Sequence, residues 1–449
     1  MNSSVINVTK INQRVTVIIE EMPWISYLTL GFVFETGSRD EDETINGITH
    51  FIEHMTFKGA EGKTAYDIAR ILENLGAFVN GYTSKEEMAI YGSFLKEKFS
   101  DVFSIIISMF KKRKYDEKDF NLEKKVILQE ISEIFDEPEE LLSEFFLKEM
   151  FPQNSLGLPV AGSLSSIENL TKSALETQLI HNWSNKRICI SIAGNIESSD
   201  ALRCIANYVD NFAHEDYQKH WSTPVRISDG FIKVIKRNDL KQIYGIIGSY
   251  TISFNDPRRY VLAILNHVVG ASRSSRLVSL LQEEKALVSY ISSFYELYSD
   301  IGIWGIFFIT NSDSLGDVLR FITEELKKLK NFGITKREMD KAVSYRKGLT
   351  ALSSEDSSLR MRHNARNFLK MGVVPTLKDI LNEYDKLTVD KVNAELDILN
   401  IDNWCGVIMG PIDDTQLVDI SIYKPIKEFQ FLLDTDKVLK KHVVSKTIY

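Results

Sequence analysis

The chain has 449 residues, which at about 150 residues per domain allows three domains or two large ones with substantial cores. Its composition is that of a globular protein, with 44% hydrophobic and 26% charged residues, and this excludes a dominant disordered or collagen-like segment. Acidic residues outnumber basic residues by 62 to 54, so the net charge is −8. That sign does not suit a protein that neutralises phosphates, and no nucleic-acid partner is expected.

The cysteines predict neither a disulfide framework nor a cysteine metal site, because Cys189, Cys204 and Cys405 lie far apart and form no C-x-x-C pair. No apolar run approaches the ~18 residues of a membrane span. The first residues lack the basic and apolar regions of a secretion signal. We therefore expect a soluble, cytoplasmic protein that does not enter a membrane.

The first half of the chain mixes strands and helices. Apolar side chains alternate from Leu28 to Phe34, and this period of two predicts a strand. Thr64 and Asp67 form a capping pattern ahead of apolar residues at helical spacing, and Gly76 ends that helix. In chain order we predict strands 14–20 and 26–35, helices 46–57 and 65–75, strands 77–83 and 87–95, helices 99–112, 117–135 and 139–150, and a strand at 188–193.

The second half repeats this order of elements. Residues 213–224 are polar and lack periodicity, which predicts a linker. After it we predict strands 231–235 and 243–254, helices 256–269 and 275–284, strands 287–297 and 301–309, helices to about 399, and a strand at 404–409. The predicted fold class is therefore α+β, with two duplicated domains at 1–212 and 225–449, each an antiparallel-rich sheet covered by helices.

The strongest functional signal is the H-x-x-E-H motif of His50, Glu53 and His54 in the first domain. On a helix, residues four apart share a face, so both imidazoles lie together with Glu53 beside them. Neutral histidine nitrogens suit Zn²⁺, and a nearby carboxylate can accept a proton from water that the metal activates. This order of residues is the inverzincin motif and predicts a hydrolase. The alternative is a pair of surface histidines on a solvated helix.

A catalytic zinc site needs a third protein ligand. Glu123 and Glu130 lie seven residues apart on one face of the predicted helix 117–135. Glu130 could bind the metal, while Glu123 could orient a ligand or the water. A glutamate on such an acidic helix is otherwise usually solvated.

Four stretches resemble the pitrilysin family of zinc peptidases, which includes insulin-degrading enzyme and the mitochondrial processing peptidase. Residues 47–60 resemble the metal helix of that family, 75–86 the strand that follows it, 123–140 the helix with the third ligand, and 155–171 a Leu-Gly-x-Pro-x-x-Gly stretch. The resemblance covers most of the chain. It implies one Zn²⁺ per chain, with His50, His54 and Glu130 as ligands, Glu53 as the general base, and Glu123 as the carboxylate behind the ligands.

The same resemblance implies how a substrate binds. In the family, unfolded peptide adds as a strand to a sheet edge beside the zinc, and main-chain hydrogen bonds give affinity without reading much sequence. Asn80, Gly81 and Thr83 occupy the corresponding positions here. On local sequence alone, Asn80 and Gly81 also fit a hairpin turn.

In one place the chain departs from the family pattern. Relatives of this size often carry an arginine seven residues before a tyrosine, and the pair stabilises the oxyanion. Tyr290 matches the tyrosine, but Glu283 stands in place of the arginine, and an ionised carboxylate cannot donate a hydrogen bond. Tyr290 is then either a catalytic hydroxyl or a buried structural residue. We expect Arg276 to pack a helix and His267 to be an ordinary core or surface histidine.

The sequence therefore predicts a zinc endopeptidase that hydrolyses short or unfolded peptides with metal-activated water, in a chamber formed by two domains or two subunits. A homodimer or a heterodimer with a related subunit is expected. The departure at Glu283 favours a second hypothesis, in which a partner subunit supplies the arginine. A structural subunit without activity is disfavoured because the metal ligands and the base are all present. A lyase with the same motif is disfavoured because such chains are far shorter.

Overall fold

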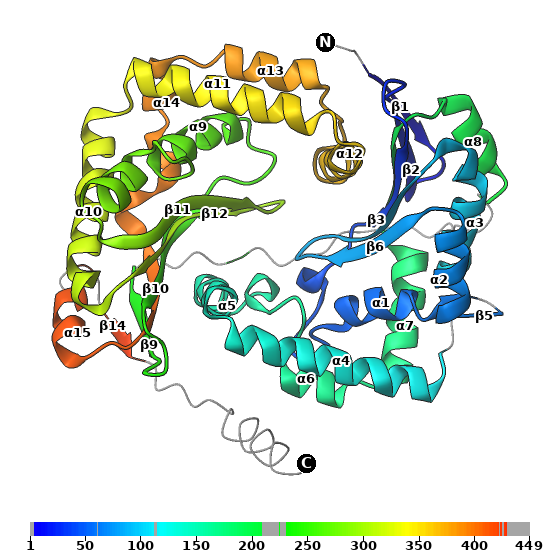
Figure 1. Cartoon of the computed structure of the whole chain (residues 1–449), viewed down its shortest axis with the longest axis horizontal. Helices are drawn as coiled ribbons and strands as arrows, with labels where there is room; N and C mark the ends of the chain where they lie inside the picture. Colours follow the sequence, from blue (N-terminus) through cyan, green and yellow to red (C-terminus); the bar gives the residue numbers. More distant parts are fainter. Residues whose placement is uncertain are drawn as a thin grey trace.

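Two six-stranded sheets form the centre of the molecule (Figure 1). The computed structural model describes residues 4–60, 62–111, 115–208, 224, 230–421, 423 and 426–428. Most neighbouring strands are antiparallel, and helices cover the sheets, which confirms the predicted α+β class.

Every predicted strand and helix of the first half is present. The strands are β1 Val5–Lys10, β2 Val15–Glu21, β3 Leu28–Phe34, β4 Gly59–Ala60, β5 Lys63–Thr64, β6 Phe78–Thr83, β7 Met88–Phe94 and β8 Ile188–Gly194. The helices are α1 Ile48–Thr56, α2 Ala65–Asn74, α3 Phe99–Lys111, α4 Glu117–Asp136, α5 Pro138–Met150, α6 Leu164–Asn169, α7 Lys172–Asn185 and α8 Ser198–Ala206. The sequence analysis missed β1, the short β4–β5 pair and α6 to α8.

The second half has the predicted elements and, in addition, two that the sequence analysis missed. Its strands are β9 Ile232–Lys236, β10 Ile243–Thr251, β11 Val288–Leu297, β12 Gly302–Thr310, β13 Cys405–Gly410 and β14 Ile426–Glu428. Its helices are α9 Arg259–Val269, a π-helical segment Val278–Glu284, α10 Leu315–Phe332, α11 Lys336–Ser353, α12 Ser357–Met371, α13 Leu377–Asp385, α14 Val389–Asn393 and α15 Asp414–Ser421. The two missed elements are α15 and β14.

The two sheets have the same strand order. The first runs β6-β7-β3-β8-β2-β1 and the second β11-β12-β10-β13-β9-β14, so each strand of one six-stranded sheet has a counterpart in the other. Of the predicted linker 213–224, only Pro224 is among the described residues, and the exact domain boundaries stay a prediction.

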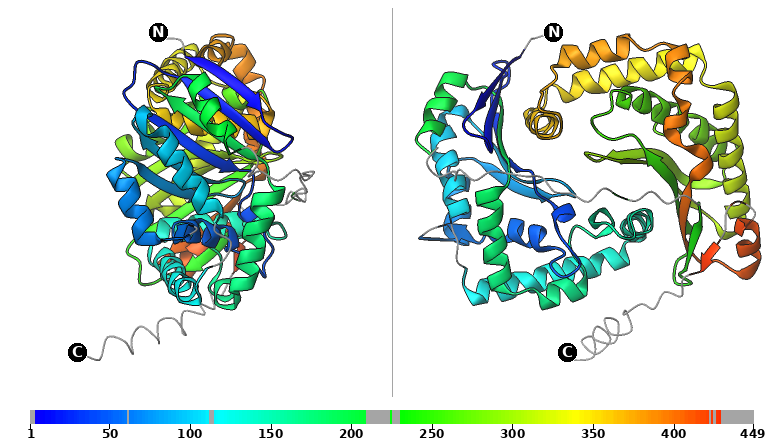
Figure 2. Two further views of the ribbon diagram at one scale, coloured as in Figure 1. Left: turned by 90° about the vertical axis from the view of Figure 1, so that its right-hand side faces the viewer. Right: turned by 180° about the vertical axis from the view of Figure 1, so that it is seen from behind.

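Each half covers the sheet of the other with one helix. Helix α5 of the first half packs on β10 and β13 of the second sheet, and α12 of the second half packs on β3 and β8 of the first. From behind, Figure 2 shows the cyan α5 beside the green second sheet and the yellow α12 beside the blue first sheet. The buried residues agree, because Phe146 and Met150 join the core of the second sheet, and Met361 and Ala365 join that of the first.

This exchange of covering helices, with α5 on the second sheet and α12 on the first, explains why β3 is buried on both faces. All seven residues of this strand are buried, although their alternation is typical of a strand with one solvated face. On one face Phe32 packs against Phe103 of α3. On the other, the side chain of Met361 occupies the space beside Gly31, where a β carbon would lie 2.3 Å from its sulfur.

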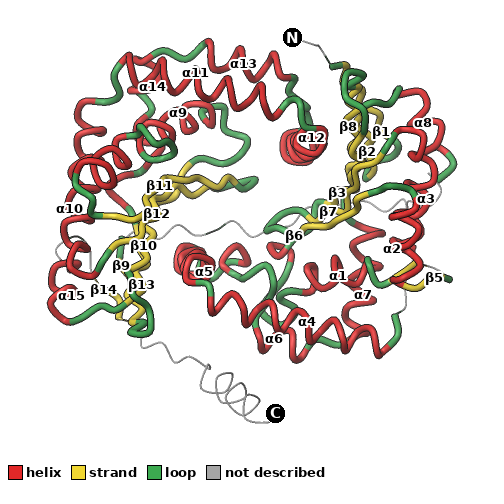
Figure 3. The backbone as a smooth tube through the Cα atoms, viewed as in Figure 1, coloured by secondary structure: helices red, strands yellow, loops and turns green. Residues whose placement is uncertain are grey.

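The hairpins at the free edges of the sheets meet at their tips. The β6–β7 and β11–β12 hairpins extend toward one another in Figure 3. The buried Arg39 lies 2.5 Å from a carboxylate oxygen of Glu86 in the first hairpin turn and 2.7 Å from one of Asp300 in the second. Lys370 of α12 also pairs with Glu86, at 2.6 Å. This charge network joins the two halves at the point where their edges meet.

A buried ion pair fixes α12 on the first sheet. Arg360 donates to Glu20 of β2 at 2.9 Å, and the amide of Asn364 donates to the same carboxylate at 2.7 Å. The side chains of Arg360 and Glu20 are only 5% and 2% exposed. Burial opposes ionisation of Glu20, but Arg360 outweighs it and lowers the pKa of this carboxyl. The stabilisation is therefore present at neutral pH and is lost as the pH falls through the lowered pKa.

In the described part of the chain, no helix is both long enough and apolar enough to span a membrane.

We predict that Arg360→Met lowers the free energy of unfolding by about 3–5 kcal/mol, because it leaves the Glu20 carboxylate buried without its cation. Urea denaturation measures the change. Arg203→Met is the matched control, since Arg203 forms an exposed pair with Asp200 whose loss should cost at most about 1 kcal/mol. Adding Glu20→Gln to Arg360→Met should recover part of the loss. Equal stability of the two single variants would contradict the assigned role.

Candidate metal centre

A buried carboxylate fixes the start of helix α1. Glu41 accepts hydrogen bonds from the backbone N–H of Gly47 at 2.7 Å and of Thr49 at 2.8 Å, two donors that a helix start leaves without partners. Burial raises the pKa of Glu41 to about 6, although these hydrogen bonds oppose the shift. Gly47 adopts φ +90°, and a β carbon there would lie 2.6 Å from the carbonyl oxygen of Ala161. The 155–171 stretch thus contacts the start of α1, the helix that carries His50 and His54.

His50 and His54 turn their Nε2 atoms toward each other. The two Nε2 atoms lie 3.1 Å apart, and His54 Nδ1 lies 2.8 Å from Oε1 of Glu123 on α4. Because an ionised carboxylate only accepts, Nδ1 of His54 carries a proton, and in the neutral ring the lone pair of Nε2 faces the site. Burial and the neighbouring His54 lower the pKa of His50 to about 4, so that this ring is neutral near pH 7.

Glu130 completes a group of three possible metal ligands. Its Oε2 lies 3.7 Å from His54 Nε2, and the ligand atoms of His50, His54 and Glu130 all lie within 4.8 Å of one another. Zinc–ligand bonds of about 2.0–2.2 Å separate the ligands of a tetrahedral ion by roughly 3.3–3.6 Å. Two imidazole lone pairs at 3.1 Å would repel each other without a cation or a proton between them. The donor set and its spacing therefore fit Zn²⁺.

Glu53 lies between α1 and strand β6. The Thr83 hydroxyl donates to Oε2 of Glu53 at 2.7 Å. A β carbon on Gly81 would lie 2.6 Å from Oε1 of the same carboxylate, so the glycine leaves room for it. Burial raises the pKa of Glu53. The hydroxyl of Thr83, a residue that the resemblance places in substrate binding, thus donates to Glu53.

Asn80 and Gly81 lie inside a strand. Asn80 pairs with Tyr91 and Gly81 with Ile90 in the β6–β7 ladder, so the alternative of a hairpin turn is wrong. Strand β6 is the outermost strand of its sheet, and among the described residues β7 is its only strand neighbour. Its second edge is where an added strand would bind. The role of Asn80, Gly81 and Thr83 toward substrate stays a prediction.

Tyr290 lies in β11, the outermost strand of the second sheet. Its side chain is 50% exposed and its ring packs on Phe307, so the alternative of a buried structural tyrosine is wrong. Glu283 is exposed in the π-helical segment Val278–Glu284. Within the described residues, no hydrogen bond joins Tyr290 to the three candidate ligands. Its catalytic role stays a prediction.

Two other predictions agree with the structure. Arg276 donates to Glu338 of α11 at 2.6 Å and packs helices, as expected. His267 is buried in α9 and its ring packs on Tyr345 at 4.6 Å, as expected for a core histidine.

Glu41 and Lys58 are the residues around the site that the sequence analysis missed. Lys58 Nζ lies 2.5 Å from Oε2 of Glu123. Burial would raise the pKa of Glu123, but the hydrogen bonds from His54 and Lys58 lower it. The signal for Lys58 was its position four residues after His54, whereas no local pattern marks Glu41.

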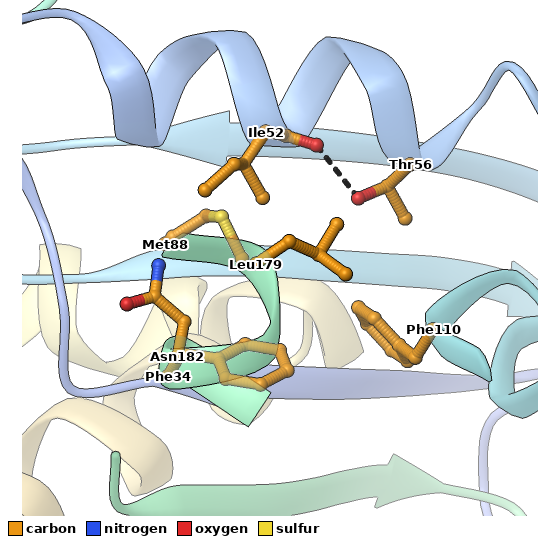
Figure 4. Close-up of a pocket in the computed structure, with 7 residues that line it drawn as sticks. All are labelled: Phe34, Ile52, Thr56, Met88, Phe110, Leu179 and Asn182. Atoms are coloured by element: carbon orange, nitrogen blue, oxygen red, sulfur yellow. Dashed lines mark hydrogen bonds between the residues drawn. The ribbon is translucent and has the colours of Figure 1, made fainter. Parts of the chain in front are cut away.

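The face of α1 opposite His50 and His54 packs against neighbouring elements. Ile52 and Thr56 face away from His50 and His54, as helical spacing requires. Figure 4 shows these two residues lining a small pocket with five residues from neighbouring elements: Phe34, Met88, Phe110, Leu179 and Asn182. The Thr56 hydroxyl donates to the carbonyl oxygen of Ile52 at 2.8 Å. This mostly apolar pocket supports the helix and lies apart from the candidate metal ligands.

Two family models match the chain in succession. Residues 16–163 match "Insulinase (Peptidase family M16)", and residues 169–345 match "Peptidase M16 inactive domain". The chain belongs to the M16 peptidase family. The resemblance to the pitrilysin peptidases is therefore confirmed, and the candidate metal group lies within the first of the two matches.

Relatives of this M16 chain are named as zinc proteases. The uncharacterized zinc protease YmxG from Bacillus subtilis is 29% identical, with 88% of this chain and 96% of YmxG covered. An uncharacterized zinc protease from Streptomyces coelicolor is 28% identical, with 89% and 88% covered.

Solved structures share the fold. A peptidase M16 inactive domain from Pseudomonas fluorescens has a TM-score of 0.83 at 18% identity, with 91% of this chain and 98% of that chain covered. A protease from Helicobacter pylori has a TM-score of 0.82 at 19% identity, with 90% and 99% covered.

We predict that the purified chain binds Zn²⁺, and that His54→Ala and Glu130→Gln each weaken binding by more than the ~10–100-fold that loss of an outer partner costs, because each removes a ligand. Metal analysis after dialysis against a chelator measures this. His181→Ala is the matched control, since His181 is exposed on α7. Unchanged zinc content in both site variants would show that the ligands are misassigned.

Proposed function

We propose that this M16 chain is a zinc-dependent endopeptidase that hydrolyses short or unfolded peptides. One Zn²⁺ is held by His50, His54 and Glu130, and Glu53 is the general base. The observation that carries the proposal is the convergence of the three ligand atoms within 4.8 Å of one another, with Glu53 on the same helix as the two histidines. The names of the relatives support zinc and proteolysis.

The side chains around the site suit peptide hydrolysis. Zinc, when bound, supplies a Lewis acid that polarises the scissile carbonyl and activates water. Glu53 accepts the proton of the attacking water on a carboxylate oxygen and passes it to the leaving amine. Thr83 holds the other carboxylate oxygen, which limits rotation of the base. Burial raises the pKa of Glu53 and brings it closer to the range that suits proton transfer.

The free edge of β6 supports an extended substrate. A peptide that adds as a strand must be unfolded there, and it gains main-chain hydrogen bonds whatever its sequence. On β6 the substrate would lie beside Gly81, next to the base. We further propose that the chain acts in the cytoplasm, and that the peptide is cleaved within a chamber formed by the two domains or by two subunits. The chain would act as a homodimer or as a heterodimer with a related subunit.

We predict that Glu53→Gln keeps the zinc and lowers kcat by about 10²–10⁴-fold, because an amide cannot accept the proton of the attacking water. Cleavage of an unstructured fluorogenic peptide, with zinc content measured on the same sample, tests this. Glu73→Gln on the exposed face of α2 is the matched control. Wild-type turnover in Glu53→Gln would remove this residue from the mechanism.

The exposed carboxylate of Glu283 favours a second candidate, in which activity needs a partner subunit that supplies the missing oxyanion donor. Loss of one such donor costs about 10²–10³ in kcat. The zinc-loaded chain alone should then cleave poorly, and a related subunit of similar size should raise kcat by that factor. Turnover by the isolated chain at the ordinary rate of ~1–10³ per second would exclude this candidate.

A further inference from the structure

Glu123 is a buried carboxylate that joins two helices. Its side chain is 5% exposed, and it lies on α4, one helical repeat before the candidate ligand Glu130. One carboxylate oxygen lies 2.8 Å from His54 Nδ1, and the other lies 2.5 Å from Lys58 Nζ. Both donors come from the α1 side of the helix pair, so each oxygen of Glu123 contacts a different residue of one short segment.

The position of Lys58 follows from the end of helix α1. The backbone N–H of Lys58 donates to the carbonyl oxygen of Met55 at 3.0 Å, so the chain keeps a turn beyond Thr56. Lys58 is four residues after His54 and therefore lies above the same face. Its side chain is 30% exposed, which leaves the ammonium group partly hydrated while it contacts a buried oxygen.

The buried carboxylate of Glu123 needs a compensating positive charge. A carboxylate removed from water needs hydrogen bonds and a compensating charge. When His54 binds a metal through Nε2, its ring is neutral and supplies one hydrogen bond to Glu123 but no charge. Lys58 supplies the charge and occupies the second oxygen. Without it, the carboxylate would gain by turning toward water, and His54 Nδ1 would lose its acceptor.

We propose that Lys58 is a positioning residue of the metal site, which acts through Glu123 to keep the Nε2 atom of His54 directed at the metal. This inference rests on the proposed zinc site and extends it to a residue that cannot bind the metal itself. A hydrogen-bonded outer partner fixes the orientation of a histidine ligand, and its loss typically weakens metal binding by about 10–100-fold.

In the part of the chain that the structure describes, His50 has no comparable contact that would orient its ring. His50 Nδ1 is buried and has no hydrogen-bond partner among the described residues, so its ring lacks an acceptor such as Glu123. Orientation of the two-histidine pair therefore depends on the contact between His54 and Glu123. Lys58 also ties α4 to α1, and α4 carries Glu130.

The alternative is that the Lys58 contact is an ordinary surface ion pair, which contributes little. Zinc affinity separates the two readings. We would measure the Zn²⁺ dissociation constant by competition with a chromogenic chelator for the full chain and for Lys58→Met, Lys58→Arg and Lys125→Met. Lys125 is the matched control, because it is an exposed lysine on α4 that forms no ion pair among the described residues.

Lys58→Met should weaken Zn²⁺ binding by about 10–100-fold, whereas Lys58→Arg and Lys125→Met should bind nearly as the wild type does. The absorption bands of bound Co²⁺ should change in Lys58→Met, because the ligand field depends on how His54 is oriented. In a Glu123→Gln background, Lys58→Met should cause no further loss, since the lysine acts through that carboxylate.

Unchanged affinity in Lys58→Met, or an equal further loss in the Glu123→Gln background, would overturn the inference. If circular dichroism shows that Lys58→Met does not fold, Lys58→Gln is measured in the same way and should also weaken binding. The proposed function fails separately, because a wild-type chain that binds no Zn²⁺ refutes the metal site itself. Wild-type binding with an unaffected Lys58→Met refutes only the role of Lys58.

Discussion

The exchange of α5 and α12 between the two halves is the constraint on which the rest of the structure depends. Each helix covers a face of the sheet of the other half, so the two halves cannot separate without exposing apolar side chains such as Phe146 and Met361 to water. The buried pair of Arg360 and Glu20 adds a fixed position to one of these contacts. The two outer strands β6 and β11 are thereby held opposite one another, and Arg39 joins the turns beyond them.

The docking of α5 on the second sheet also limits the position of α4, the helix that carries the candidate ligand Glu130. Helix α4 ends at Asp136 and α5 begins at Pro138, so the helix that carries Glu130 continues directly into the one docked on the second sheet. At its other end, Glu123 binds His54 and Lys58 beside α1. The third candidate ligand is therefore positioned by contacts with both halves. A loop could not hold Glu130 as precisely, because a rigid helix fixed at two points leaves little freedom to the residue between them.

The sequence predicted what local periodicity encodes. Most strands of the two sheets, the helices α1 to α3 and α5, and the spacing of His50 and His54 follow from patterns of two and of 3.6 residues, and the helix with Glu130 follows in the same way. The exchange of helices could not be predicted, because periodicity does not tell which sheet a helix covers. For the same reason the alternation in β3 predicted a strand but did not show that α12 buries its second face. Asn80 and Gly81 fit a turn locally, but pairing with β7 overrides that preference. Lys58 was missed because its partner lies 65 residues away on another helix.

The second half has the same architecture as the first but lacks a group of metal ligands among its described residues. Helix α9 has the place of α1, and Asn266 and His267 repeat the spacing of Glu53 and His54, but Ala263 stands four residues before His267, where a second histidine would be needed. Asn266 accepts from the indole of Trp304 at 3.0 Å and donates to a carbonyl of β11, as a core residue does. Tyr345 of α11 covers His267, whereas Glu123 of α4 accepts from His54. In that place an aromatic ring packs on His267 and no carboxylate contacts it among the described residues, so the second helix pair stabilises the fold while the first holds the candidate metal site.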